Sequence, residues 1–140
     1  MRSCELCVFD LNDSPDWTKL KPMPTVSLLA LSDHLAKDPL AEMVKGCLSV
    51  GTLLFAAYGE FADEMEDQID LVLENESRLD IITTSHQGDE MEDVANFIIN
   101  AAYRESGHFR CLVVLDKRMA NSNLLLSEME KLCTDLSETR

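Results

Sequence analysis

The pentapeptide DEMED occurs twice in the chain, at residues 63–67 and again at residues 89–93. Carboxylates gathered in this way could bind a divalent cation, because Mg²⁺ and Ca²⁺ prefer oxygen ligands. They could also stabilise the start of a helix, where they face unpaired backbone N–H groups and the positive end of the helix dipole. Neither copy is accompanied by a D-x-D-x-D-G calcium loop or a glycine-rich phosphate loop. We therefore interpret both copies as helix starts with a solvated acidic face, and we predict no metal site and no bound cofactor.

A second group of reactive residue types begins at Ser85 and His86, which directly follow a run rich in β-branched residues. Together with Asp116 they could form a Ser–His–Asp constellation. However, an adjacent serine and histidine do not easily align as nucleophile and base, and the chain has no G-x-S-x-G elbow. Walker, G-x-G-x-x-G and H-E-x-x-H motifs are absent as well. We name no catalytic residue and favour a histidine that is satisfied within a turn.

The five cysteines are Cys4, Cys7, Cys47, Cys111 and Cys133. Cys4 and Cys7 form a C-x-x-C motif, but a zinc site usually needs a second pair of ligands, and the histidines are scattered singly. A thioredoxin-type motif would open a helix after a strand, whereas this one lies at the extreme terminus. We expect the cysteines to behave as free, buried, structural thiols in a reducing compartment.

The charge of the chain is strongly negative and concentrated in one segment. Twelve lysines and arginines stand against 26 acids, and residues 60–93 hold 13 of those acids with Arg78 as their one base. Such a protein repels phosphate backbones and anionic lipid and attracts basic surfaces, which excludes direct binding to nucleic acid or membrane. Since no apolar stretch approaches the roughly 20 residues that span a bilayer, and the N-terminus lacks a signal-peptide pattern, we expect a cytoplasmic protein.

The pattern of apolar residues predicts alternating strands and helices. Expected strands lie at residues 25–31, 52–58, 78–85 and 109–116, with apolar-striped helices at 39–50, 62–75, 89–103 and 121–137. This order predicts an α/β three-layer sandwich, with a mostly parallel sheet of four to five strands and helices on both faces, flavodoxin-like or Rossmann-like. Residues 25–140 form the single α/β domain, and residues 1–24 add an edge strand and a loop segment to the same domain.

Short stretches of the chain are similar to a known family. GC at 46–47, YG at 58–59, TTSH at 83–86 and FRCLVVLD at 109–116 resemble a family of small uncharacterised bacterial domains. The resemblance covers most of the chain after its N-terminal segment. Because that family carries no assigned activity, the resemblance implies a bacterial, cytosolic α/β domain and says nothing about mechanism.

In a parallel sheet both DEMED segments start beyond the carboxyl ends of the strands, where open α/β proteins place their functional surface. If their strands are neighbours, the two segments would join in one acidic patch. We expect a small acidic binding protein that occupies a basic surface of a partner, in the manner of an immunity protein, antitoxin or inhibitor. The partner would be a toxin or a nucleic-acid-binding protein. The expected interface is Tyr58, Glu60, Asp63, Glu64, Glu66, Asp67, His86, Asp89, Glu90, Glu92 and Asp93.

Two alternatives stay open. One is a small enzyme or ligand-binding domain that uses the strand ends around His86 and Asp116, with or without Mg²⁺. The other, compatible with a binding role, is a homodimer through the C-terminal helix, because Leu124, Leu125 and Leu126 in succession form a wider apolar surface than one stripe needs.

Overall fold

The computed structural model describes residues 3–10, 15–32, 37–105, 108–116, 118–119 and 121–138. Each expected strand and helix is present there, with small shifts of its ends. In chain order the elements are β1 (Ser3–Asp10), the short 3₁₀ helix η1 (Trp17–Lys19), β2 (Thr25–Ala30), α1 (Lys37–Ser49), β3 (Thr52–Tyr58), α2 (Ala62–Asn75), β4 (Ile82–His86), α3 (Met91–Glu105), β5 (His108–Leu115) and α4 (Ser122–Glu138).

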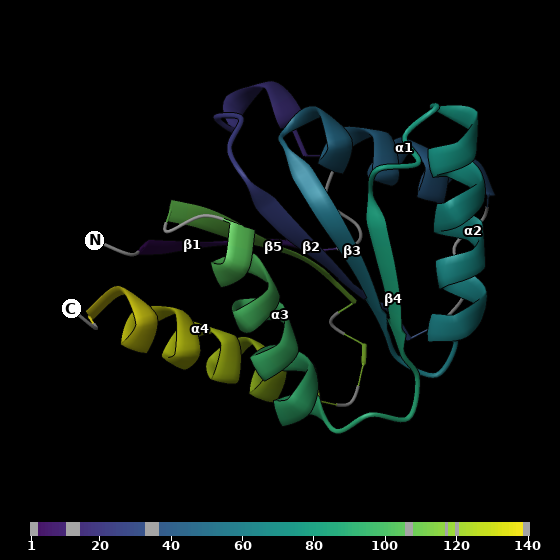
Figure 1. Ribbon diagram of the computed structural model, residues 1–140. Coiled ribbons are helices and arrows are strands. Elements are labelled where there is room, and N and C mark those ends of the chain that lie inside the picture. Colours follow the sequence, from purple (N-terminus) through teal and green to yellow (C-terminus); the bar gives the residue numbers. More distant parts are fainter. Residues whose placement is uncertain are drawn as a thin grey trace.

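The strands form one sheet in the order β1-β5-β2-β3-β4, and every neighbouring pair is parallel. Helices α1 and α2 cover one face of this sheet and α3 and α4 cover the other (Figure 1). The predicted three-layer α/β sandwich is therefore confirmed. Counted from β2, the strands β2 to β5 follow the Rossmann order, and β1 is an additional edge strand beside β5.

Two hydrophobic cores lie on the two faces of the sheet. Leu28 of β2 packs toward α3 and α4, whereas its neighbour Leu29 packs toward α1 and α2. Both side chains are fully buried. A strand covered on both faces needs apolar residues at successive positions, which is why the central strands read as continuous apolar runs.

The third predicted strand was wrong at its start, because residues 78–81 lie outside the strand and residues 79–80 form a turn. Ser77 has a left-handed φ of 58°, its N–H donates to Glu74, and the Arg78 N–H donates to Leu73. This pair of bonds is the Schellman motif that commonly ends helices. Arg78 then pairs with Asp80 at 3.1 Å, and β4 begins at Ile82. The strand is thereby limited to five residues.

Residues 15–24 are fixed to the sheet by Trp17. Its ring meets Phe9 of β1 edge to face, with ring centroids 5.4 Å apart. On α1 a Cβ atom added at Gly46 would come within 2.0 Å of the indole. Glycine at position 46 therefore allows the close contact between α1 and this segment.

The expectation of free thiols was wrong for two cysteines, because Cys4 and Cys133 form a disulfide. Cys4 lies on β1 and Cys133 on α4, and α4 packs against this edge strand (Figure 1). The buried Cys111 places its Sγ 3.9 Å from the Sγ of Cys4. Cys7, Cys47 and Cys111 are free. The bond thus joins the first strand to the last helix across 129 positions of sequence.

None of the described helices combines the length and apolar character that crossing a bilayer requires.

Candidate functional site at the carboxyl ends of the strands

The two DEMED segments lie at the same end of the sheet but on opposite faces of it. The first begins at the second residue of α2. The second DEMED segment begins two residues before its helix, since α3 begins at Met91. The carbonyl of Glu90 accepts the N–H of Val94. The predicted start of this helix at Asp89 was therefore two residues early. Acids do occupy the first turn of both helices, as the interpretation as helix starts requires.

The end of β4 connects the two acidic segments. Ser85 donates a hydrogen bond to the carboxylate of Asp63, in the first copy. The side-chain oxygen of Gln87 accepts the backbone N–H of Asp63 at 3.1 Å. The neighbouring His86 places Nδ1 3.1 Å from Oδ2 of Asp89, in the second copy. Residues 85–87 therefore hold one carboxylate from each copy.

His86 is a buried histidine whose ring contacts three other described side chains, those of Thr84, Asp89 and Phe97. Its Nδ1 donates to Asp89, because a carboxylate can only accept, and its Nε2 lies 2.9 Å from the hydroxyl of Thr84. The ring also packs against Phe97 of α3, with centroids 4.8 Å apart. Since the side chain is 10% exposed, a partner would meet Asp89 before it met the imidazole. His86 is suited to orienting Asp89.

Two adjoining hollows of about 380 and 290 Å³ lie at the strand ends beside α3, and the first of them is lined mainly by polar atoms. Both are bordered by Tyr58, Asp89 and Asn121. Burial, and then the charges of Glu90 and Asp89, raise the pKa of Tyr58, so its phenol remains a neutral hydrogen-bond donor. The other acids of the second DEMED segment and Glu60 complete the walls: Glu60, Glu90, Glu92 and Asp93.

The first DEMED segment faces a different direction. Asp63 and Asp70 turn toward β4, where they accept hydrogen bonds from Ser85 and from Thr83, the latter at 2.6 Å. Glu66 lies between them, and its pKa is raised by partial burial and by its neighbours Asp70, Asp67 and Asp63. The expected single patch is therefore two surfaces, one along α2 beside β4 and one around Tyr58, and residues 85–87 connect them.

We call these two surfaces together the acidic surface. Between described residues, Asp89 is its one member in an ion pair, and the partner is His86. The lysine and arginine pairs within the described part of the chain hold other acids, namely Glu5, Glu76, Asp80 and Asp116. Eight acids of this surface have no lysine or arginine nitrogen of a described residue within 4.0 Å of their carboxylate oxygens. They are Glu60, Asp63, Glu66, Asp67, Asp89, Glu90, Glu92 and Asp93.

Asp116, the other residue of the enzyme alternative, belongs to a separate cluster. Asp116 directly follows β5. The chain continues from β5 to one face of the sheet and from the neighbouring β2 to the other face. The side chain of Asp116 is 3% exposed. The hydroxyl of Ser32 donates to one carboxylate oxygen, and the guanidinium of Arg118 donates to both, at 3.0 and 3.1 Å. His86 and Asp116 thus each hold other partners. Residues 30–38 contain no glycine, so the strand-end loop after β2 lacks the nucleotide fingerprint.

Asp116→Asn is expected to lower the free energy of unfolding at neutral pH by about 1.5–3 kcal/mol, the range for hydrogen bonds to a charged group. Hydrogen bonds from Arg118 and Ser32 hold the pKa of Asp116 well below its usual range. A depressed pKa contributes stability above the unfolded-state value near pH 4, which is lost as the pH falls below it. The difference between wild type and variant, measured by urea unfolding, should therefore shrink between about pH 4 and about pH 2. A difference that is constant across this range would contradict an ionised, hydrogen-bonded Asp116.

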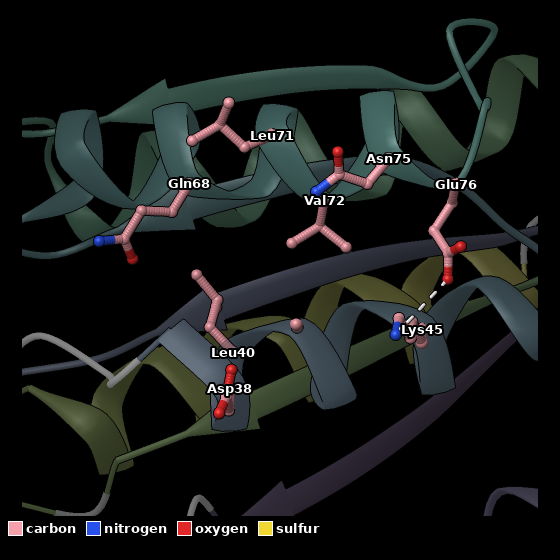
Figure 2. A pocket seen from close by; sticks show the side chains of 9 residues that line it. Asp38, Leu40, Lys45, Gln68, Leu71, Val72, Asn75 and Glu76 are labelled. Carbon is pink, nitrogen blue, oxygen red and sulfur yellow. Dashed lines mark ion pairs between the residues drawn. The ribbon is translucent and has the colours of Figure 1, made fainter.

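A third hollow, which the sequence did not predict, lies between α1 and α2. Figure 2 shows Leu40 and Val72 pointing into this groove of about 300 Å³, with the ion pair between Lys45 and Glu76 at one end. Leu71 borders it and is 56% exposed. The one sequence signal was Leu71 itself, an apolar residue outside the buried stripe of α2. The groove could hold an apolar side chain or a small apolar molecule.

The fold and the site define a class of protein: a parallel α/β sandwich with an acidic surface at its strand ends. The chain belongs to the family described as Domain of unknown function (DUF7684), whose model matches residues 4–135. This match confirms the resemblance to an uncharacterised family. No curated protein and no solved structure matches the chain.

Proposed function

We propose that this chain is a small acidic binding protein whose acidic surface occupies a basic surface of a partner protein, in the manner of an immunity protein, antitoxin or inhibitor. The observation that carries the proposal is the arrangement at the end of β4. Ser85 and His86 hold one carboxylate from each DEMED segment, and most surrounding acids have no lysine or arginine partner among the described residues.

The electrostatics favour a basic partner over the alternatives. Nearby like charges cost free energy unless an opposite charge approaches, so a cationic partner relieves repulsion that the free protein carries. At Glu66, partial burial raises the pKa most, and the neighbouring charges of Asp70, Asp67 and Asp63 raise it further. Complementary charge would give fast association that weakens with salt. Such a role needs no catalytic residue, and it makes the protein a binder of a toxin or a nucleic-acid-binding protein.

We place this function in the bacterial cytoplasm. The redox state of the Cys4–Cys133 pair in cells tests this location. A reducing compartment keeps most thiols reduced, so Cys4–Cys133 would form there only when oxidant reaches it. Rapid alkylation of cell extracts, followed by mass spectrometry of the two cysteine peptides, reads their state. Free thiols in growing cells are expected. A disulfide in every molecule would move the protein to an oxidising compartment.

The binding role is tested by reversing charges on the acidic surface. The variant carries Glu66→Lys, Asp67→Lys, Glu92→Lys and Asp93→Lys. Because the contact is electrostatic, partner capture at about 150 mM salt should weaken by about 100-fold or more. Affinity for the captured partner is then measured by titration with purified proteins, with and without added salt.

A matched control carries the same charge change elsewhere, as Glu42→Lys, Glu128→Lys, Glu130→Lys and Asp135→Lys. Net charge is then equal in the two variants, and only the location differs. The control should keep the partner and the variant should lose it. Equal binding by both would place the interface outside the acidic surface, and equal loss by both would reduce the effect to net charge.

A further inference from the structure

β4 ends the sheet, and its outer edge pairs with no strand among the described residues. Such an edge offers a row of backbone N–H and C=O groups to an additional strand. Proteins usually protect an edge with a charged side chain, a proline or a bulge. The segment ITTSH has no acid, lysine, arginine or proline, and its pairing with β3 runs without a register shift. By its own sequence, β4 is open to a further strand.

The charge near this edge comes from α2, which runs beside β4 (Figure 1). Thr83 and Ser85 point to the same face, and their hydroxyls donate to Asp70 and Asp63. These bonds fix two carboxylates next to the edge, with Glu66 between them along the helix. The carboxylates of Asp63, Glu66 and Asp70 therefore form a row along β4, on the face of the strand that α2 covers.

The opposite face of the edge carries one exposed apolar side chain, Ile82, on the same face as Thr84 and His86. Ile82 is 55% exposed although isoleucine is commonly buried. Alternation along the strand places Ile82 on the face away from Thr83 and the carboxylates. The edge thus presents negative charge on one face and an apolar side chain on the other.

We propose that the free edge of β4 binds an extended basic segment of the partner protein as a sixth strand of the sheet. Lysine or arginine side chains of that segment meet Asp63, Glu66 and Asp70, and an apolar side chain covers Ile82. This inference rests on the proposed function and specifies the form of the partner's basic surface.

The spacing of the carboxylates suits such a strand. Residues two apart on a strand lie about 6.7 Å apart on one face. Glu66 and Asp70 are separated by four helical residues, a rise of about 6 Å. Two basic residues at alternate positions can therefore reach neighbouring carboxylates. A second copy of this chain fits less well, because pairing two β4 edges would bring two acidic α2 rows toward each other.

The test uses a short acetylated peptide of alternating lysine and valine, compared with the same peptide N-methylated at its backbone amides. Methylation keeps the charge and removes the donors that strand pairing needs. Binding followed by amide NMR should perturb β4, and methylation should weaken it about 10-fold or more. Glu66→Lys should weaken binding similarly, while Glu130→Lys, with the same charge change on α4, should leave it within about twofold.

The outcomes separate this inference from the proposed function. Equal binding of both peptides would overturn strand addition and leave the acidic surface proposal standing. Absence of binding by either peptide, while the partner capture above succeeds, would also overturn it. If sedimentation shows a dimer that Ile82→Lys dissociates, the edge of β4 pairs with a second copy of the chain. That result would overturn the proposal that a basic segment binds there. Binding that requires both unmethylated amides and Glu66 would support it.

Discussion

Replacing Cys4 and Cys133 together with alanine is expected to lower the free energy of unfolding by about 2–5 kcal/mol. The two residues are separated by 129 positions, so the disulfide closes nearly the whole chain into a loop. A bond that closes so long a loop restricts the unfolded chain strongly, and this restriction stabilises the folded state. The bond also attaches β1, an edge strand with one strand neighbour, to α4.

Urea unfolding of the oxidised protein, of the reduced protein and of the double variant measures this effect. The reduced protein and the variant should unfold at similar, lower urea concentrations. Cys7→Ala is the matched control, because Cys7 lies on the same strand and is a free, half-buried thiol. Cys7→Ala should lower the free energy of unfolding much less than the double variant does. A double variant as stable as wild type would show that the bond adds nothing to the stability of the fold.

Replacing both cysteines also avoids leaving a second free thiol against Cys111. Cys111 Sγ lies 3.9 Å from Cys4 Sγ, so a single Cys133 variant would leave two free thiols in contact. Burial raises the pKa of Cys111 to about 12, which keeps it protonated and unreactive while the fold is intact. In the double variant Cys111 no longer contacts the sulfur of Cys4.

The order of strands and helices could be predicted because a parallel sheet covered on both faces requires apolar runs between amphipathic helices. Strand β3 and helix α2 lie at their predicted positions. The start of β4 moved because of a local backbone conformation. Ser77 adopts the left-handed conformation usually left to glycine, and no apolar pattern reports it.

Most acids of the candidate site could be predicted, but not the directions that they face. Acids at both helix starts followed from the sequence, yet Asp63 faces β4 and Asp89 faces Tyr58. These directions depend on α2 and α3 covering opposite faces of the sheet, which requires the strand order. The disulfide is hidden for the same reason, since Cys4 and Cys133 meet only because β1 joins the edge that α4 covers.

Arg110→Met is expected to lower the free energy of unfolding by about 2–5 kcal/mol, because it removes a buried guanidinium that donates to two backbone carbonyls. Arg110 lies within the apolar strand β5 and is 1% exposed. Its guanidinium donates to the carbonyls of Lys21 and Val50, and Nε lies 3.5 Å from the carboxylate of Glu5 without forming a hydrogen bond. One side chain thus connects β1, the segment before β2 and the turn before β3.

Methionine keeps most of the length of arginine but cannot donate, so both carbonyls lose their partner. Thermal and urea unfolding measure the loss, and Arg78→Met provides the control, since Arg78 forms an exposed ion pair with Asp80. Of these two variants, only Arg110→Met should lower the free energy of unfolding appreciably. Glu5→Gln separates the ion pair from the carbonyl bonds: a loss close to that of Arg110→Met would assign the stabilisation to Glu5, while a small loss would assign it to Lys21 and Val50. Equal, small losses for both arginine variants would contradict a stabilising role for the buried guanidinium.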